Sequence, residues 1–186
     1  QRGVSLLDGQ TLGERGRYWG EGLGLIEALE FDGDGLWVLH DDGALVELNV
    51  PDLSRAGRTA QACCGGARGG ELDPATGELV VGCAGECAPA WMWSWDGQYE
   101  PVLRADENYR SEVGVVSVDP LGRYLVSPTR DGRSALWDRR AEDPLVVFGE
   151  SPLVQVVWDP RGEVLYGLDD RRRLWKWSIA QVMGLR

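Results

Sequence analysis

The sequence is 186 residues long and strongly acidic, with 30 Asp and Glu, 19 Lys and Arg, a net charge of -11 and 43% hydrophobic residues. The hydrophobic share is typical of a globular protein, and so acidic a chain is a poor ligand for phosphate backbones, so we expect no nucleic-acid partner. No stretch approaches the roughly 20 apolar residues that cross a bilayer, so we expect no membrane span. Lys176 is the single lysine among many arginines, a bias typical of GC-rich coding and hence of a bacterial source.

In chain order, the first predicted strands are Val4–Leu7 and about Glu14–Trp19. Four copies of one pattern follow, each an apolar strand end, an Asp-Pro or Asp-Gly turn and a β-rich strand. Asp accepts hydrogen bonds from turn amides, Pro presets φ and Gly supplies a positive φ. The turns begin at Asp32, Asp73, Asp119 and Asp159, which are 41, 46 and 40 positions apart. This spacing is the length of one propeller blade, roughly 40–45 residues.

A second landmark closes the third strand of each unit and supports the same register. It is Leu48-Asn49, Trp95-Asp96, Trp137-Asp138 and Trp177-Ser178, with a fifth copy at Leu7-Asp8. Polar turns at 41–43, 131–132 and 169–170 separate the second and third strands, as in β-hairpins. We letter the four strands of a unit A to D from the central channel outward. In unit two they are predicted at about 67–72, 78–83, 91–95 and 100–103. The tail 179–185 is expected to form one short helical turn.

The sequence therefore predicts an all-β propeller of about four and a half four-stranded blades. The expected parts are a partial blade at 1–19 and blades at about 20–61, 62–107, 108–149 and 150–186. Val4–Leu7 and Trp175–Trp177 would both be third strands, so one closed four-bladed ring cannot hold both. Open strand edges invite further pairing. We expect a segment of a larger seven- or eight-bladed ring, stable only with further blades from the same protein or a second chain, with self-association as the alternative.

The segment Val116–Asp138 resembles the strand–turn–strand–turn–strand–Trp-Asp unit of WD40 repeats, and the likeness covers nearly the whole chain. The Trp-Asp pair is present at 95–96 and 137–138 and becomes Trp-Ser at 177–178, while the family's Gly-His pair is absent. The resemblance implies a scaffold or sensor, often beside an effector domain such as an NTPase, kinase or protease.

The four cysteines interrupt the repeat in unit two. Cys63 and Cys64 lie in the connection that enters this unit, and Cys83 and Cys87 flank its lengthened loop between the second and third strands. Both segments emerge on one propeller face, so the thiols are expected to lie together. Three alternatives remain: disulfides that pair Cys63 or Cys64 with Cys83 or Cys87 in an exported protein, free thiols in a cytosolic one, or a zinc site of all four, disfavoured because adjacent cysteines rarely ligate one metal.

Catalysis has little support in the sequence. A Ser-His-Asp arrangement would need His40, the only histidine, which is interpreted as an exposed turn residue. The acidic pairs at 41–42 and 169–170 fall at equivalent turns, where structure explains them, and the arginines at 171–173 are interpreted as a solvated turn. No phosphate-binding glycine loop occurs. We therefore expect no enzyme and no cofactor.

Binding is expected on the loops of one face, because loops on a rigid scaffold carry recognition. Arg and aromatic side chains are enriched at interface hot spots. The candidates are Trp19, Arg68, Tyr109, Arg110 and Arg130, although the aromatic ones could simply pack blade edges. The leading hypothesis is a non-catalytic module that binds a protein or peptide, with a cytoplasmic location favoured. The alternative is an exported, disulfide-stabilised propeller that binds a small ligand or glycan.

Overall fold

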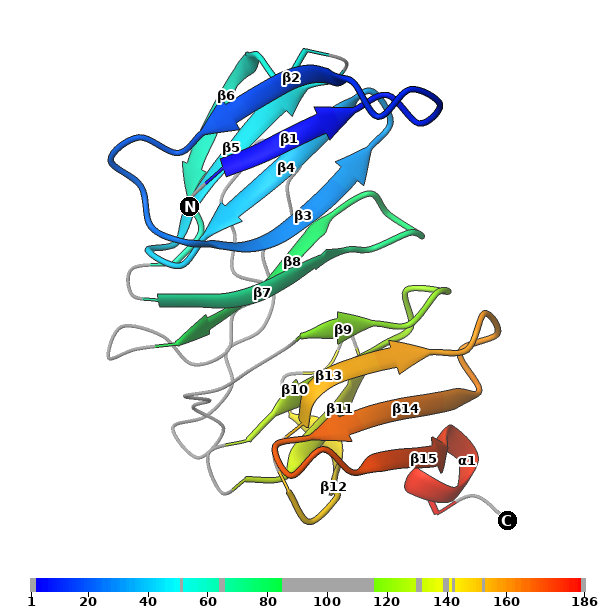
Figure 1. Cartoon of the computed structure of the whole chain (residues 1–186). Coiled ribbons are helices and arrows are strands. Elements are labelled where there is room, and N and C mark those ends of the chain that lie inside the picture. The colour runs from blue at the N-terminus through cyan, green and yellow to red at the C-terminus, as the bar shows by residue number, and fades with distance from the viewer. Residues whose placement is uncertain are drawn as a thin grey trace.

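The computed structural model describes residues 3–184 except 51, 64–65, 85–115, 130–131, 139–140, 142 and 152. Within these residues nearly all regular secondary structure is antiparallel β-sheet (Figure 1). The predicted strands C and D of unit two, the pair Trp95-Asp96 and the turn residue Asp131 lie outside the described residues. The blade boundaries given above therefore stay a prediction.

The strands form five sheets that follow the chain order. An N-terminal hairpin pairs β1 (Gly3–Leu7) with β2 (Glu14–Trp19). The first sheet is β3 (Ile26–Asp32), β4 (Gly35–His40), β5 (Ala44–Asn49) and β6 (Arg55–Gln61). The second is β7 (Gly66–Leu72) and β8 (Leu79–Ala84). The third is β9 (Ser117–Val118), β10 (Tyr124–Pro128), β11 (Ser134–Asp138) and β12 (Pro144–Phe148). The fourth is β13 (Leu153–Trp158), β14 (Val164–Asp169) and β15 (Leu174–Ser178), followed by α1 (Ile179–Val182).

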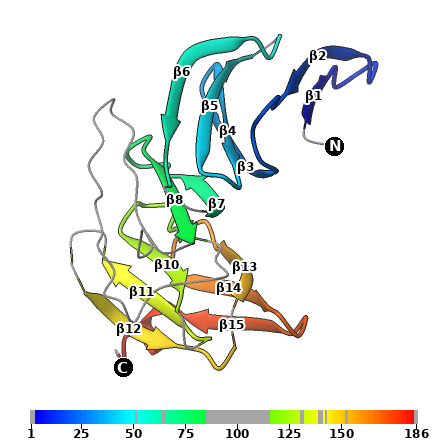
Figure 2. The same cartoon turned by 90° about the vertical axis from the view of Figure 1, so that its left-hand side faces the viewer.

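The sheets stand face to face along an arc, with the N-terminal hairpin at one end and the fourth sheet at the other (Figure 2). Their innermost strands β3, β7, β9 and β13 contact one another in that order. This is the architecture of a partial β-propeller, as the spacing of the turn aspartates predicts. The single short helical turn at the C-terminal end is also as predicted.

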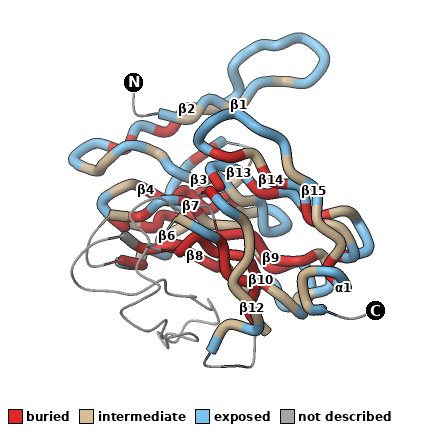
Figure 3. Tube along the Cα trace, turned by 90° about the horizontal axis from the view of Figure 1, so that it is seen from below, coloured by how far each residue is buried: buried red, intermediate tan, exposed pale blue. Residues whose placement is uncertain are grey.

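A separate apolar cluster fills each space between neighbouring sheets. Trp37 and Leu39 of the first sheet pack on Ala67 and Val81 of the second, and similar clusters join the second sheet to the third and the third to the fourth. The N-terminal hairpin packs on the other side of the first sheet through Tyr18. Figure 3 shows that buried residues gather in the strands, whereas the loop of the N-terminal hairpin is exposed. Each sheet is therefore stabilised by its neighbours, as in other repeat folds.

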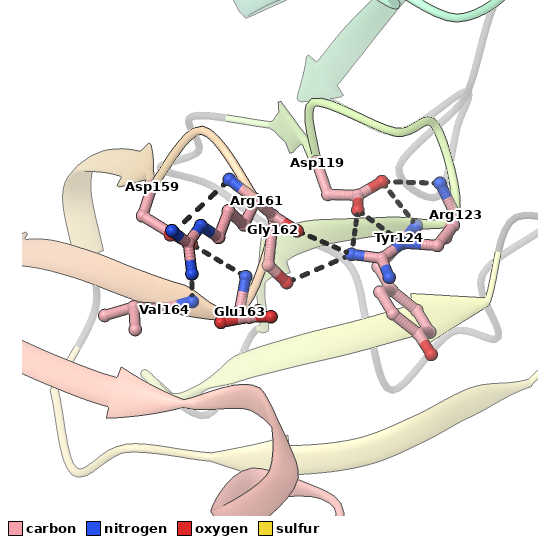
Figure 4. A network of polar contacts seen from close by, with 8 residues as sticks. All are labelled: Asp119, Arg123, Tyr124, Asp159, Arg161, Gly162, Glu163 and Val164. Atoms are coloured by element: carbon pink, nitrogen blue, oxygen red, sulfur yellow. Dashed lines mark hydrogen bonds and ion pairs between the residues drawn. The ribbon is translucent and has the colours of Figure 1, made fainter.

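Polar contacts also join the first turns of neighbouring sheets (Figure 4). The buried Asp119 carboxylate accepts hydrogen bonds from Arg123 N, Tyr124 N and Arg123 Nε. Arg123 Nη2 then donates to the carbonyls of Arg161 and Gly162 in the next sheet, at 3.3 and 3.2 Å. Gly162 has φ +65°, and a Cβ there would meet the Asp119 carboxylate at 2.6 Å. This contact between the two turns thus requires glycine at position 162.

Replacing Arg123 with Ala should lower the free energy of unfolding by about 1.5–3 kcal/mol, because it leaves the buried Asp119 carboxylate without its charged donor. The measurement is urea unfolding relative to the parent chain under the same conditions. Arg161→Ala is the matched control: its backbone carbonyl remains, so its effect should stay within about 0.5 kcal/mol. Equal losses in the two variants would contradict the inter-sheet role of Arg123.

Candidate functional site

The connections between sheets and the turns between second and third strands lie at the same end of the sheets. We call this end the connection face; its described parts include 20–25, 41–43, 62–63, 149–151 and 170–173. In each sheet, one residue at the end of the second strand, within one position of its last residue, is buried at this face. These four equivalent residues are His40, Cys83, Thr129 and Asp169. We call them the anchor residues.

His40 is the anchor of the first sheet, and it is completely buried (0% exposed). Its Nδ1 lies 3.1 Å from the Gly24 carbonyl, and its Nε2 lies 3.2 Å from the Tyr18 hydroxyl. A carbonyl only accepts, so Nδ1 carries the proton and Nε2 accepts from Tyr18. The interpretation of His40 as an exposed turn residue is therefore wrong. The strand continues through His40, and Gly20 leaves room for the ring, since a Cβ there would lie 2.6 Å from His40 Cε1.

The turn that follows His40 fixes the connections on both sides of it. The Asp41 carboxylate accepts from Leu25 N at 2.7 Å, and the Asp42 carboxylate accepts from Gly24 N at 3.1 Å. On the other side, Gly43 O accepts from Ala62 N at 2.8 Å, in the connection that enters the second sheet. The turn thus joins three consecutive parts of the connection face, and its acidic pair has a structural role, as the sequence indicated.

Cys83 is the anchor of the second sheet and forms a disulfide with Cys63. The two Cα atoms are 5.6 Å apart, and both side chains are buried beside Trp37 and Leu39. The predicted disulfide is confirmed for this pair, which excludes free thiols or a zinc site at these two residues. Cys64 and Cys87 lie outside the described residues. The bond joins the second strand to the connection that enters the same sheet.

Asp169 is the anchor of the fourth sheet. Burial alone would raise its pKa, but hydrogen bonds from Trp175 Nε1 and from Arg173 N and Nε lower the pKa to about 2. Arg173 Nη2 also donates to Ser151 Oγ at 2.8 Å, in the connection that enters this sheet. Part of the arginine turn is therefore structural, not only solvated. The end of the second strand is thus linked to the connection that enters the same sheet by a hydrogen bond in the first sheet, a disulfide in the second and an arginine-mediated contact in the fourth.

Two of the five predicted binding residues are described, and both are exposed. Trp19 ends β2, with the Arg17 guanidinium 5.5 Å from its ring centroid. Arg68 lies on the innermost strand β7 and makes no ion pair or hydrogen bond with any described residue. The first sheet separates these two strands, so the structure does not bring Trp19 and Arg68 together. Tyr109, Arg110 and Arg130 lie outside the described residues.

A central cavity of about 500 Å³, which the sequence analysis missed, lies along the innermost strands. Its walls include Glu30, Glu71, Val118, Gln155 and Trp158. Glu30 and Glu71 each stand two positions before a turn aspartate, so the repeat itself carried a signal for them.

These glutamates make one repeated contact between neighbouring sheets. Glu71 Oε2 accepts from Val118 N of the third sheet at 2.9 Å, and Glu30 accepts from the Leu72 backbone of the second. Burial raises the pKa of both carboxyls, with a further rise at Glu30 from the Glu71 charge. The cavity therefore has an acidic wall whose two carboxyls hold neighbouring inner strands together.

Other kinds of site find no support in the described part of the chain. No three His, Cys, Asp or Glu side chains among these residues converge as metal ligands would. None of the helices in the same residues is long and apolar enough to span a membrane.

Removal of the disulfide by Cys63→Ser and Cys83→Ser should lower the free energy of unfolding by about 3 kcal/mol, the loop-closure value for a loop of this size. Urea unfolding of this variant and of the parent measures the loss. Peptide mapping without reduction checks the pairing. A Cys63–Cys64 or Cys83–Cys87 bond instead would contradict the assigned link.

Glu71→Gln tests the contact at the cavity wall through its pH dependence. The folded pKa of Glu71 lies above its unfolded value, so folding favours the protonated form. The contribution of Glu71 to the free energy of unfolding is complete below the unfolded pKa, about 4.3, and is lost as pH rises through the folded pKa. Gln stays neutral and can still accept from Val118 N. The stability of the variant relative to the parent should therefore increase from pH 4 to pH 7; a decrease would contradict the burial argument.

Comparison with known proteins supports the fold. No protein-family model and no curated protein sequence matches the chain. The structure is similar to the β-propeller domain of Cps50 (Swd1) from Myceliophteria thermophila, with a TM-score of 0.71, 14% identity and 95% of this chain covered. The chain spans 60% of the length of that domain. It is also similar to the computationally designed Ika4 protein, with a TM-score of 0.65, 14% identity, and 84% of this chain and 92% of that one covered. These likenesses show that the chain has a propeller fold of the kind that WD40-like repeats imply.

Proposed function

We propose that the chain is a non-catalytic scaffold or sensor module that binds a protein or peptide on its connection face, within a larger bacterial protein. The observation that carries this proposal is the set of anchor residues. Three of them tie the connection face to the sheets by a hydrogen bond, a disulfide and an ion pair. A binding surface fixed in this way loses little conformational entropy when a partner docks.

The exposed side chains near this face have the chemistry of an interface. Arg17 and Trp19 stack at the end of β2, and Arg68 is exposed on β7. Arg and Trp are the residue types most enriched among binding hot spots. The exposed Arg68 guanidinium favours a partner segment with carboxylate groups, because guanidinium binds carboxylate with two parallel hydrogen bonds. The Arg17 guanidinium already pairs with Glu14.

The alternative is an exported propeller that binds a small ligand or glycan. The Cys63–Cys83 disulfide favours it, because such bonds persist in oxidising compartments. The cavity of about 500 Å³ is large enough for a small ligand. Fractionation of the source cells separates the two hypotheses: protein in the cytosol supports the intracellular scaffold, and protein outside the cytosol supports the exported module.

Peptides selected from a random display library against the parent chain test the proposal. Arg68→Ala or Trp19→Ala should weaken binding of a selected peptide at least tenfold, measured by titration calorimetry. Arg161→Ala is the matched control at the opposite end of the sheets and should leave the affinity unchanged. Peptides that bind all three variants as tightly as the parent would contradict a site on the connection face.

A further inference from the structure

The two ends of the arc each expose a sheet face whose equivalent is buried elsewhere in the molecule. We call these the N-terminal open face, formed by Leu7, Leu12, Leu29 and Phe31, and the C-terminal open face, formed by Val157, Tyr166 and Leu174. All seven side chains are exposed. The repeat allows each of them to be compared with its own counterpart in an inner sheet.

Leu12 shows the contrast at the N-terminal open face. Leu12 and Leu53 lie 41 positions apart in equivalent loops, both with φ 57° and both with an N–H bonded to the carbonyl four residues earlier. Leu53 is 3% exposed because it packs on the N-terminal hairpin, beside Tyr18. Leu12 is 71% exposed, with no earlier sheet on which to pack. Because Leu12 and Leu53 are equivalent, the burial of Leu53 predicts a further sheet that would bury Leu12 in the same way.

Leu29 and Phe31 show that the N-terminal hairpin covers only part of the first sheet. They pair with Val38 and Leu36 across β3 and β4 and share their face. Val38 and Leu36 are buried under the hairpin, whereas the two residues of the innermost strand are not. Two strands beside the inner edge of β1 would cover Leu29 and Phe31, as β3 and β4 cover the sheet that follows them.

The C-terminal open face shows the same contrast. Leu174 is 75% exposed, whereas its counterpart Leu45 is 1% exposed beneath the second sheet. Tyr166 is exposed, whereas its counterparts Trp37 and Val126 are buried. β15 also lacks a fourth strand among the described residues, although β5 and β11 each pair with one.

Strand counting gives the size of the segment that would cover both faces. The structure describes fifteen strands, and the sequence predicts two more at about 91–95 and 100–103. Seventeen strands fill about three fifths of a seven-bladed ring of about 28 strands. This share agrees with the 60% of the Cps50 (Swd1) propeller domain that the chain spans. An eight-bladed ring would reduce the share to about one half.

We propose that the open faces pack against about eleven further strands of the same polypeptide, joined to it at the β1 side. They comprise an outer strand beside β15, two complete blades, and an inner hairpin beside β1. The sheet geometry permits covalent continuity: β4 joins β5 through the three-residue turn 41–43, so a strand paired with the inner edge of β1 would end within reach of Gly3. A second copy would bring seventeen strands to about eleven positions. This proposal is independent of the proposed binding function.

The test compares the intact natural polypeptide with the 186-residue chain. The intact polypeptide should be monomeric, and backbone amides of β1 and β15 should exchange hydrogen at least tenfold more slowly in it than in the 186-residue chain. The 186-residue chain should self-associate as its concentration rises in sedimentation velocity. Leu12→Lys with Leu174→Lys should reduce this association, whereas Leu121→Lys, at an exposed leucine away from both faces, should not.

Three results would overturn the proposal. If the intact polypeptide had no further repeats, or gave no added protection to β1 and β15, no strands of the same polypeptide would cover the open faces. A 186-residue monomer that melts cooperatively at every concentration would show that the faces need no cover. A discrete dimer with β1 and β15 protected would assign both faces to a second copy.

Discussion

The link between the end of the second strand and the connection that enters the same sheet organises one whole face of this molecule. His40 makes it by a hydrogen bond to Gly24, Cys83 by a disulfide to Cys63, and Asp169 through Arg173 to Ser151. Each anchor is buried, so an unpaired polar group at these positions would be costly. The position is therefore constrained by the need for a partner, and the first, second and fourth sheets satisfy that need with different chemistry.

A second constraint acts at the inner edge of the first and second sheets, beside the central cavity. There Glu30 and Glu71 reach across to backbone amides of the next inner strand, while apolar clusters fill the space between sheets. The equivalent residues further along are Ser117 and Val157. The carboxylate contact therefore joins the first sheet to the second and the second to the third, but not the third to the fourth. The sheets are joined by nearest-neighbour contacts alone.

The repeat made most of the fold predictable from sequence. The turn aspartates and the Trp-Asp landmarks set the strand positions, and even the strands of the N-terminal hairpin follow from the fifth copy at Leu7-Asp8. Proximity of Cys63 and Cys83 also followed from the topology, but the choice among disulfide, thiol and zinc did not, because spacing alone does not fix oxidation state.

His40 shows why the rest of the site could not be predicted. Its position after an apolar strand and before Asp41-Asp42-Gly43 is equally compatible with a turn, and its partners Tyr18 and Gly24 come from other elements. Glu30 and Glu71 look like ordinary strand residues until the inner strands are placed side by side. Periodicity indicates which face a residue occupies, whereas tertiary partners decide its burial.

The central claim is that these links hold the connection face as rigidly as the sheets. Backbone order parameters from nitrogen-15 relaxation test it most directly at Gly24, Leu25 and Ala62, whose N–H groups bond to the turn after His40. We predict values of about 0.85 at all three, equal to those of the strands. Values below about 0.6 at these amides, with rigid strands beside them, would contradict the account.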